Sequence, residues 1–169
     1  DVWFCSGQSN IAFQLQNSEN GAAEVKKAIA NSTIRLFNAK AICDTDETAW
    51  DAATLVKTNQ LEFFSGSWSV CDSISAKDFS AIAYYFGKNI AHEENVPVGL
   101  IQVAVGGSPI ESWIDRNTLE YDDKVVDVLT NWRKSDFIMP WVRERANMNL
   151  KNASNQKQRH PYDPAYNFE

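Results

Sequence analysis

The pattern of apolar residues predicts two buried strands that each end at a glycine-containing turn. The first strand opens the chain over residues 1–5 and is followed by the turn 5–10. The second strand spans 98–105 as a near-continuous apolar run, which is typical of a strand covered on both faces of a parallel sheet. It stops at the pair Gly106-Gly107. A further strand is predicted over 33–37, where β-branched residues alternate with others.

Helical spacing is clearest in the segment before the second buried strand. Behind Asp78, a residue type that often caps the start of a helix, apolar side chains recur at intervals of three and four residues: Phe79, Ile82, Ala83, Phe86 and Ile90. Shorter and longer helical patterns cover 21–30 and 117–151. We expect 39–75 to be mostly loop and 151–169 to be irregular.

Strand, crossing helix and second strand together predict an α/β fold with a mostly parallel sheet. In open sheets of this kind the chemistry lies at the carboxyl ends of the strands. No repeat divides the chain, so we expect residues 1–169 to belong to one domain. Because a strand is already under way at Asp1, we expect the natural polypeptide to begin upstream.

Charge and composition exclude several classes of protein. The chain has 44% hydrophobic residues, as globular proteins do, and its 16 basic and 22 acidic residues give a net charge of −6. That balance argues against nucleic acid and anionic membrane surfaces as partners. An apolar run of the roughly 18 residues that a membrane span requires is not found. The odd set Cys5, Cys43 and Cys71 predicts no zinc site and leaves either one disulfide or three thiols open.

Two turns contain the residues best suited to chemistry. Ser9 follows the first strand beside Gly7, so its hydroxyl is expected at the sheet edge, where backbone N–H groups can stabilise the oxygen of a carbonyl under attack. After the second strand, Gly106 and Gly107 allow close approach of a ligand and leave the Gly107 N–H free to donate. Glu111 can order that loop, reach the site or cap the next helix. On spacing alone, both turns are more often merely turns.

Other candidate residues have simpler interpretations. His92, near the end of the central helix, is expected to complement the helix dipole, and His160 to be structural or exposed. The acidic segment 44–47 lacks the features of a calcium loop. Asp115 and Arg116 can touch substrate and can as readily form a surface pair. Three tryptophans can stack on a sugar but are more often core residues: Trp113, Trp132 and Trp141.

Four segments, in the same order, resemble the sialate O-acetylesterase and related carbohydrate acetylesterase families of the SGNH hydrolases. They are DVWFCSGQSN (1–10), FSAIAYYFG (79–87), PVGLI (97–101) and GGSPIESW (106–113). The resemblance implies a flavodoxin-like three-layer α/β/α arrangement, of which this chain supplies the N-terminal part.

Carried over to this chain, the resemblance implies that Ser9 is the nucleophile. The amides of Ser9 and Gly107 would form part of the oxyanion hole, and four residues would support the substrate or the loop: Gln8, Asn10, Ser108 and Glu111. No cofactor or metal is implied. The family's Gln-Gly-Glu block and its Asp-x-x-His-Pro block, which brings the base and its carboxylate, are absent. We therefore expect a C-terminal segment or a second chain to supply the Asp and His.

The implied reaction is hydrolysis of an acetyl ester on a sialic acid or a plant-type polysaccharide. The alternative is a carbohydrate-binding remnant that kept the cleft and lost the base. The family's habit of export leads us to expect a periplasmic, secreted or lysosomal protein. Because a sheet cut part way leaves an unpaired edge and an uncovered apolar face, we expect the isolated chain to dimerise, bind a partner chain or aggregate.

Overall fold

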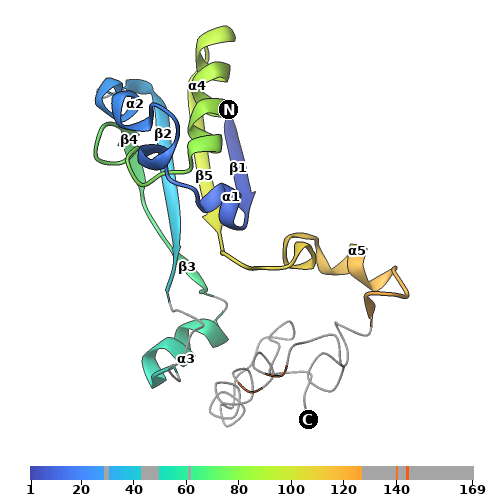
Figure 1. Cartoon of the computed structure of the whole chain (residues 1–169). Coiled ribbons are helices and arrows are strands. Elements are labelled where there is room, and N and C mark those ends of the chain that lie inside the picture. Colours follow the sequence, from blue (N-terminus) through green and yellow to red (C-terminus); the bar gives the residue numbers. More distant parts are fainter. Residues whose placement is uncertain (29–30, 43–49, 61, 127–139, 141–143, 145–169) are drawn as a thin grey trace. The chain divides into compact units, whose positions relative to one another are not determined.

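The computed structural model of the chain describes residues 1–28, 31–42, 50–60, 62–126, 140 and 144. The chain divides into two compact units, one formed by 1–40 with 65–113 and the other by 41–64 with 114–169. The first unit contains most of the sheet and both turns that the sequence predicts to be functional (Figure 1).

The described strands form a five-stranded sheet in the order β1-β5-β2-β3, with β4 also paired to β2. Their bounds are β1 Val2–Gly7, β2 Asn31–Ala41, β3 Phe64–Ser65, β4 Trp68–Cys71 and β5 Val98–Ala104. Both β1 and β2 run parallel to β5, whereas β4 is antiparallel to β2. The central position of β5 explains its apolar sequence, because neighbours on both sides shield it. The prediction that the first strand is buried is wrong: Val2, Trp3 and Phe4 are exposed, because β1 lies at the edge of the described sheet. The predicted α/β fold with a mostly parallel sheet is confirmed.

Among the described residues, the first unit contains three α-helices and two 3₁₀ turns, of which α4 packs on β5. They are α1 (Ser9–Ala12), the 3₁₀ turn η1 (Leu15–Asn17), α2 (Gly21–Lys27), α4 (Ala81–Glu93) and the 3₁₀ turn η2 (Ile110–Trp113). The longest, α4, lies directly on β5: a Cβ added at Gly87 would be 2.5 Å from the Cδ1 of Leu100. The buried core between helices and sheet includes Leu15, Leu36, Phe79, Tyr84 and Leu100.

The start of α4 differs from the sequence prediction. Its N-cap is Ser80, whose hydroxyl accepts from the Ala83 N–H at 3.3 Å, and not Asp78. The Ser80 N–H is itself bound to Gln102 Oε1 on β5 at 2.6 Å, so the buried cap also fixes the helix to the sheet. Asp78 lies outside the helix and accepts from Gln16 Nε2.

The apolar residues that mark this helix in the sequence are not all buried. Ile82 is 53% exposed, whereas the buried helical positions are Ala81, Ala83, Tyr84 and Gly87. Phe86 instead meets Trp3 of β1 edge to face, with ring centroids 5.1 Å apart. Among the buried positions, Gly87 lets the helix lie close to Leu100 of the sheet.

The prediction of a mostly loop segment over 39–75 missed several regular elements. This segment contains the end of β2, the helix α3 (Ala52–Asn59), β3 and β4. Asp51 caps α3 by accepting from the Thr54 N–H at 2.7 Å. In the helical pattern over 117–151, the described helix is the short α5 (Arg116–Glu120), and most of the remainder lies outside the described residues. Among the helices that are described, none is long and apolar enough to cross a bilayer.

Candidate active site

The two predicted turns leave the sheet at the same edge. In the β1–β5 register Gly7 lies opposite Ala104, and the Val105 N–H donates to the Gly7 carbonyl at 3.1 Å. Figure 1 shows both strand ends together, with α1 beside them. Ser9 and Gly107 follow these strand ends by two and three residues respectively, so strand pairing places both turns at the carboxyl edge where α/β sheets hold ligands.

Gly7 permits the abrupt turn from β1 into α1. Its φ is +153°, and a Cβ added there would lie 2.9 Å from Ile11 Cγ1. A larger residue would therefore clash with the helix that follows. As a result, Ser9 begins α1 immediately after the strand, with its side chain exposed.

The Ser9 side chain is held by its neighbour Gln8. The Ser9 hydroxyl donates to Gln8 Oε1 at 2.8 Å, and the Ser9 N–H faces the same oxygen at 3.4 Å. The carboxamide oxygen of Gln8 thus accepts hydrogen bonds from both the hydroxyl and the amide that a serine esterase would use. Both groups would have to exchange this partner before the hydroxyl could pass its proton to a base.

The loop after β5 is organised around Ser108. Its hydroxyl donates to the Val105 carbonyl at 2.7 Å and accepts from Trp113 Nε1 at 2.9 Å. Between Val105 and Ser108, Gly107 adopts a φ of +76°, a left-handed conformation that favours glycine. The predicted support role of Ser108 in the loop therefore has a structural basis, and Trp113 bonds to this loop through its indole N–H.

The remaining predicted site residues lie in or beside these two turns. Gln8 and Asn10 are exposed next to Ser9. Glu111 is half-buried in η2 and does not cap the next helix, since Asp115 accepts from the Thr118 N–H at 3.1 Å as the N-cap of α5. The Thr118 hydroxyl also bonds to Asp115 and lowers the pKa of that carboxyl below its ordinary value.

The predicted surface pair of Asp115 with Arg116 is wrong. Arg116 Nε instead pairs with Glu120 Oε1 at 2.7 Å, one helical turn further on. This i,i+4 spacing brings the two side chains onto the same face of α5, whereas adjacent residues point in different directions.

His92 lies at the far end of β5 from Ser9. It occupies the exposed last turn of α4, with Nδ1 3.0 Å from Glu93 Oε1, and α4 leads into the beginning of β5. The seven residues of β5 extend over about 20 Å from there to the edge that carries Ser9. His92 is therefore unsuited to act as the base, in agreement with the simpler interpretation of this residue. His160, Trp132 and Trp141 lie outside the described residues.

The described residues contain no group of three or more potential metal ligands. Cys5 and Cys71 are free thiols, and burial raises the pKa of Cys71 to about 11. Both Cys43 and the acidic segment 44–47 lie outside the part that the structure describes.

Sequence reasoning missed how Gln8 and Trp113 contribute to the two turns. Gln8 was expected only to support the site, and Trp113 was weighed as a stacking or core residue. The spacing of five residues between Ser108 and Trp113 gives no helical or strand signal, so only the folded loop reveals their hydrogen bond. For Gln8, adjacency to a serine at the start of a helix was the available signal.

Comparison with known proteins identifies the family of the chain. Residues 1–138 match the family model described as carbohydrate esterase, sialic acid-specific acetylesterase. Sialate O-acetylesterases from Mus musculus and Rattus norvegicus are 30% and 29% identical over 125 residues, which cover 71% of this chain and 21% of theirs. The chain thus spans about a fifth of the length of these relatives.

A solved structure agrees with this assignment. The crystal structure of a carbohydrate acetylesterase from Xanthomonas citri superimposes with a TM-score of 0.55 at 26% identity, covering 73% of this chain and 26% of the other. The segments on which the resemblance was recognised all fall inside the matched region, 1–138. The chain therefore belongs to the sialic acid-specific acetylesterase family of carbohydrate esterases.

Proposed function

We propose that the natural protein containing this chain is a serine esterase that removes acetyl groups from sugars, with Ser9 as its nucleophile. The observation that carries the proposal is the pairing of β1 with β5. It holds the Val105 nitrogen 3.1 Å from the Gly7 carbonyl oxygen, so both turns begin at one edge of the sheet. Membership of the acetylesterase family supports the same chemistry. Ser9 is exposed, so a substrate can reach its hydroxyl once the bond to Gln8 Oε1 is exchanged.

In the proposed reaction, Ser9 Oγ attacks the acetyl carbonyl carbon while its proton passes to a base. The amides of Ser9 and Gly107 stabilise the oxyanion, and the sugar oxygen leaves as a protonated hydroxyl. Water then cleaves the acetyl-serine ester and releases acetate. We propose that an Asp and a His from polypeptide outside these 169 residues supply and orient the base. No described histidine lies at this edge, because His92 is at the opposite end of β5.

Acetate release from O-acetylated sialic acid and from acetylated xylan tests this proposal in the natural full-length protein. We expect hydrolysis of at least one of these sugars and its loss, by at least about 1,000-fold, in Ser9→Ala with an unchanged circular dichroism spectrum. Ser73→Ala, at an exposed serine outside both turns, is the matched control and should retain wild-type activity. Binding of the sugar without acetate release, or full activity in Ser9→Ala, would support the non-catalytic alternative or a different nucleophile.

A further inference from the structure

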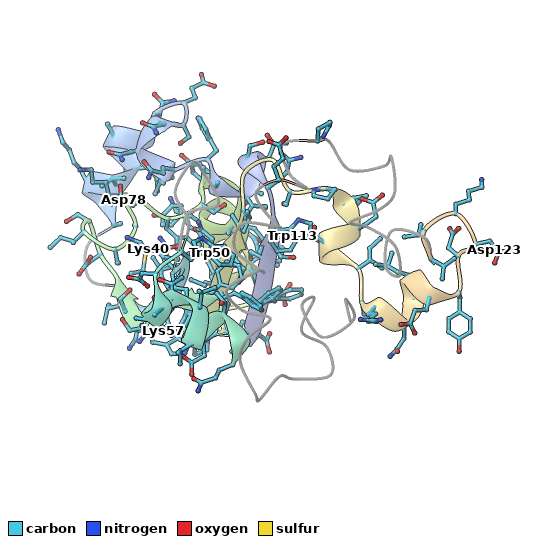
Figure 2. All side chains as sticks on the ribbon, turned by 90° about the horizontal axis from the view of Figure 1, so that it is seen from below. Lys40, Trp50, Lys57, Asp78, Trp113 and Asp123 are labelled. Atoms are coloured by element: carbon cyan, nitrogen blue, oxygen red, sulfur yellow. The ribbon has the colours of Figure 1, made fainter. Side chains whose placement is uncertain are left out.

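A chain of hydrogen bonds connects η2 to the end of β5. Trp113 Nε1–H donates to Ser108 Oγ at 2.9 Å, and the Ser108 hydroxyl donates to the Val105 carbonyl at 2.7 Å. The Ser108 N–H reaches the same carbonyl at 3.3 Å, and the Val105 N–H continues to Gly7. Trp113, labelled in Figure 2, is half-buried, so its indole N–H uses this partner in place of water.

Packing does not fix the two glycines that this chain of bonds encloses. A Cβ added at Gly106 or Gly107 would meet nothing within 4 Å, and both residues are exposed. The direction of the Gly107 N–H is therefore determined by its φ of +76° and by the bonds at Val105 and Ser108 on either side. Loss of those bonds would leave the amide without a packing contact at either glycine to fix its direction.

We propose that Trp113 and Ser108 are positioning residues that hold the Gly107 amide in the direction needed to stabilise the oxyanion. Trp113 acts through the Ser108 hydroxyl, which holds the loop against the carbonyl of Val105, the first residue after β5. This inference rests on the proposed function, because it assigns these residues to the same acetyl-transfer step. Small misplacements of a transition-state donor reduce the rate strongly while leaving substrate binding nearly unchanged.

Steady-state kinetics of acetyl ester hydrolysis by the full-length protein test the proposal. Trp113→Phe keeps the aromatic ring and removes only the N–H, and we expect kcat to fall about 10-fold with KM within about twofold. Ser108→Ala breaks both side-chain bonds and should lower kcat about 100-fold, while Ser108→Thr, which keeps a hydroxyl, should restore most of it. Ser112→Ala, in the same loop and exposed, is the matched control and should stay within about twofold.

The double variant gives the sharpest result. Because Ser108→Ala already interrupts the path from Trp113, adding Trp113→Phe should lower kcat little further. A trifluoromethyl ketone, which forms a tetrahedral adduct with serine, should lose affinity in parallel with kcat across the series. Melting temperatures of Trp113→Phe and Ser108→Thr identify any effect that is due only to unfolding.

Three results would overturn the positioning role: additive losses in the double variant, changes confined to KM, or losses no larger than that of Ser112→Ala. Failure of the proposed function looks different, since either the unmodified protein would release no acetate or Ser9→Ala would remain active, whatever the loop variants do. Loss of activity in Ser9→Ala together with wild-type kinetics in the loop variants would reject only the positioning role.

Discussion

At the scale of single residues, the hydrogen bonds of Ser9 make the charge on its neighbour important. Gln8 Oε1 lies 2.8 Å from the Ser9 hydroxyl and 3.4 Å from the Ser9 amide nitrogen. In Gln8→Glu a carboxylate would compete for these donors and repel the negative charge that develops on the substrate oxygen. At about 4 Å that repulsion is worth roughly 1 kcal/mol in water and about 4 kcal/mol near a protein surface.

We therefore expect Gln8→Glu to lower kcat for acetyl ester hydrolysis at pH 7 by about 10-fold or more. Gln8→Ala, which removes the oxygen without adding charge, is the control and should be clearly faster than Gln8→Glu. Equal rates for the two variants would show that Gln8 Oε1 does not face the developing charge.

Gly7 provides a prediction about stability at the same turn. Gly7→Ala places a Cβ 2.9 Å from Ile11 Cγ1 at a φ of +153°, so we expect the free energy of unfolding to fall by about 1–3 kcal/mol. Gly106→Ala, where an added Cβ meets nothing within 4 Å, should change it by less than about 1 kcal/mol. Urea unfolding followed by fluorescence measures both. A Gly7→Ala protein as stable as Gly106→Ala would contradict the account of this turn.

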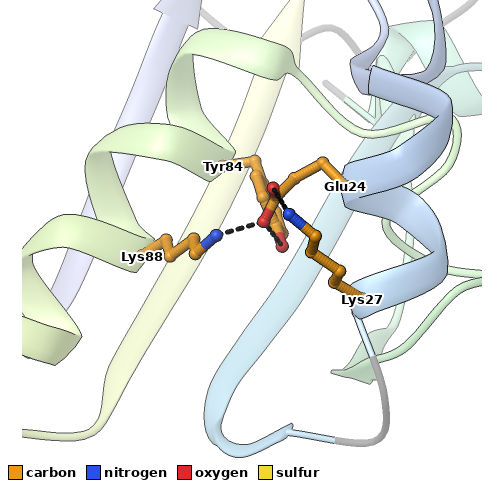
Figure 3. Close-up of polar contacts among 4 residues, drawn as sticks. All are labelled: Glu24, Lys27, Tyr84 and Lys88. Carbon is orange, nitrogen blue, oxygen red and sulfur yellow. Dashed lines mark hydrogen bonds and ion pairs between the residues drawn. The ribbon is translucent and has the colours of Figure 1, made fainter. Parts of the chain in front are cut away.

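At the scale of secondary-structure elements, a half-buried ion pair ties α2 to α4. The Glu24 carboxylate accepts a hydrogen bond from Lys88 (Figure 3). Its Oε1 also accepts from the Tyr84 hydroxyl at 3.5 Å, and its Oε2 lies 3.8 Å from Lys27 Nζ. The hydrogen bond from Lys88 is the main reason that the pKa of Glu24 falls below its ordinary value, despite the opposing effect of burial. Burial is the main reason that the pKa of Tyr84 is raised.

A lowered pKa in the folded state means that this pair stabilises the fold above the ordinary pKa of a glutamate, 4.5, and that the stabilisation is lost as the pH falls through the folded value. We expect Glu24→Gln to lower the free energy of unfolding by about 1 kcal/mol at pH 7, a modest value because Lys88 is partly exposed. The difference from wild type should shrink below pH 4.5. A difference that is constant from pH 7 to pH 3 would contradict the assignment.

Some of these secondary-structure elements could be predicted from the sequence and others could not. The strand β5 and the helix α4 were predictable because burial imposes apolar patterns on them. The strand β1 was predictable from its apolar run, although its first three residues are exposed. The cap of α4 was not, since Asp78 and Ser80 are both suitable residue types and only the bond from Ser80 to Gln102 of β5 decides between them. Elements α3 and β4 are short and lie in segments with many exposed residues, so no hydrophobic period marks them.

The candidate site was predictable to a similar extent. Ser9 and Gly107 were singled out because each follows a strand at a glycine turn, and the adjacency of β1 and β5 agrees with that interpretation. The bonds that organise the turns join side chains to neighbours through loop geometry, as between Ser108 and Trp113. Such contacts have no periodic sequence signal.

At the scale of the whole molecule, one face of the sheet exposes apolar side chains. Strand register places Val2 and Phe4 on the same face as Val70 and Trp68, and these residues are 65%, 64%, 38% and 48% exposed. Trp68 lies across Gly99 next to Val2 on this face, since a Cβ at Gly99 would be 3.2 Å from both side chains. An apolar surface of this kind favours association.

We therefore expect the 169-residue chain alone to form dimers or larger species at micromolar concentration, as measured by light scattering after size exclusion. Phe4→Lys should reduce this association, because a charge on the exposed face opposes it. Ile74→Lys, at a position that is 82% exposed and outside the strands, is the control. A stable monomer of the unmodified chain would contradict the expectation.

The central claim is that Ser9 forms a covalent bond with the acyl group. Its most direct test is mass spectrometry of the natural full-length protein after reaction with a fluorophosphonate, which captures nucleophilic serines. We expect one adduct, mapped to the peptide that contains Ser9 and absent in Ser9→Ala. An active esterase whose adduct maps to another residue, or one that keeps its adduct in Ser9→Ala, would contradict it.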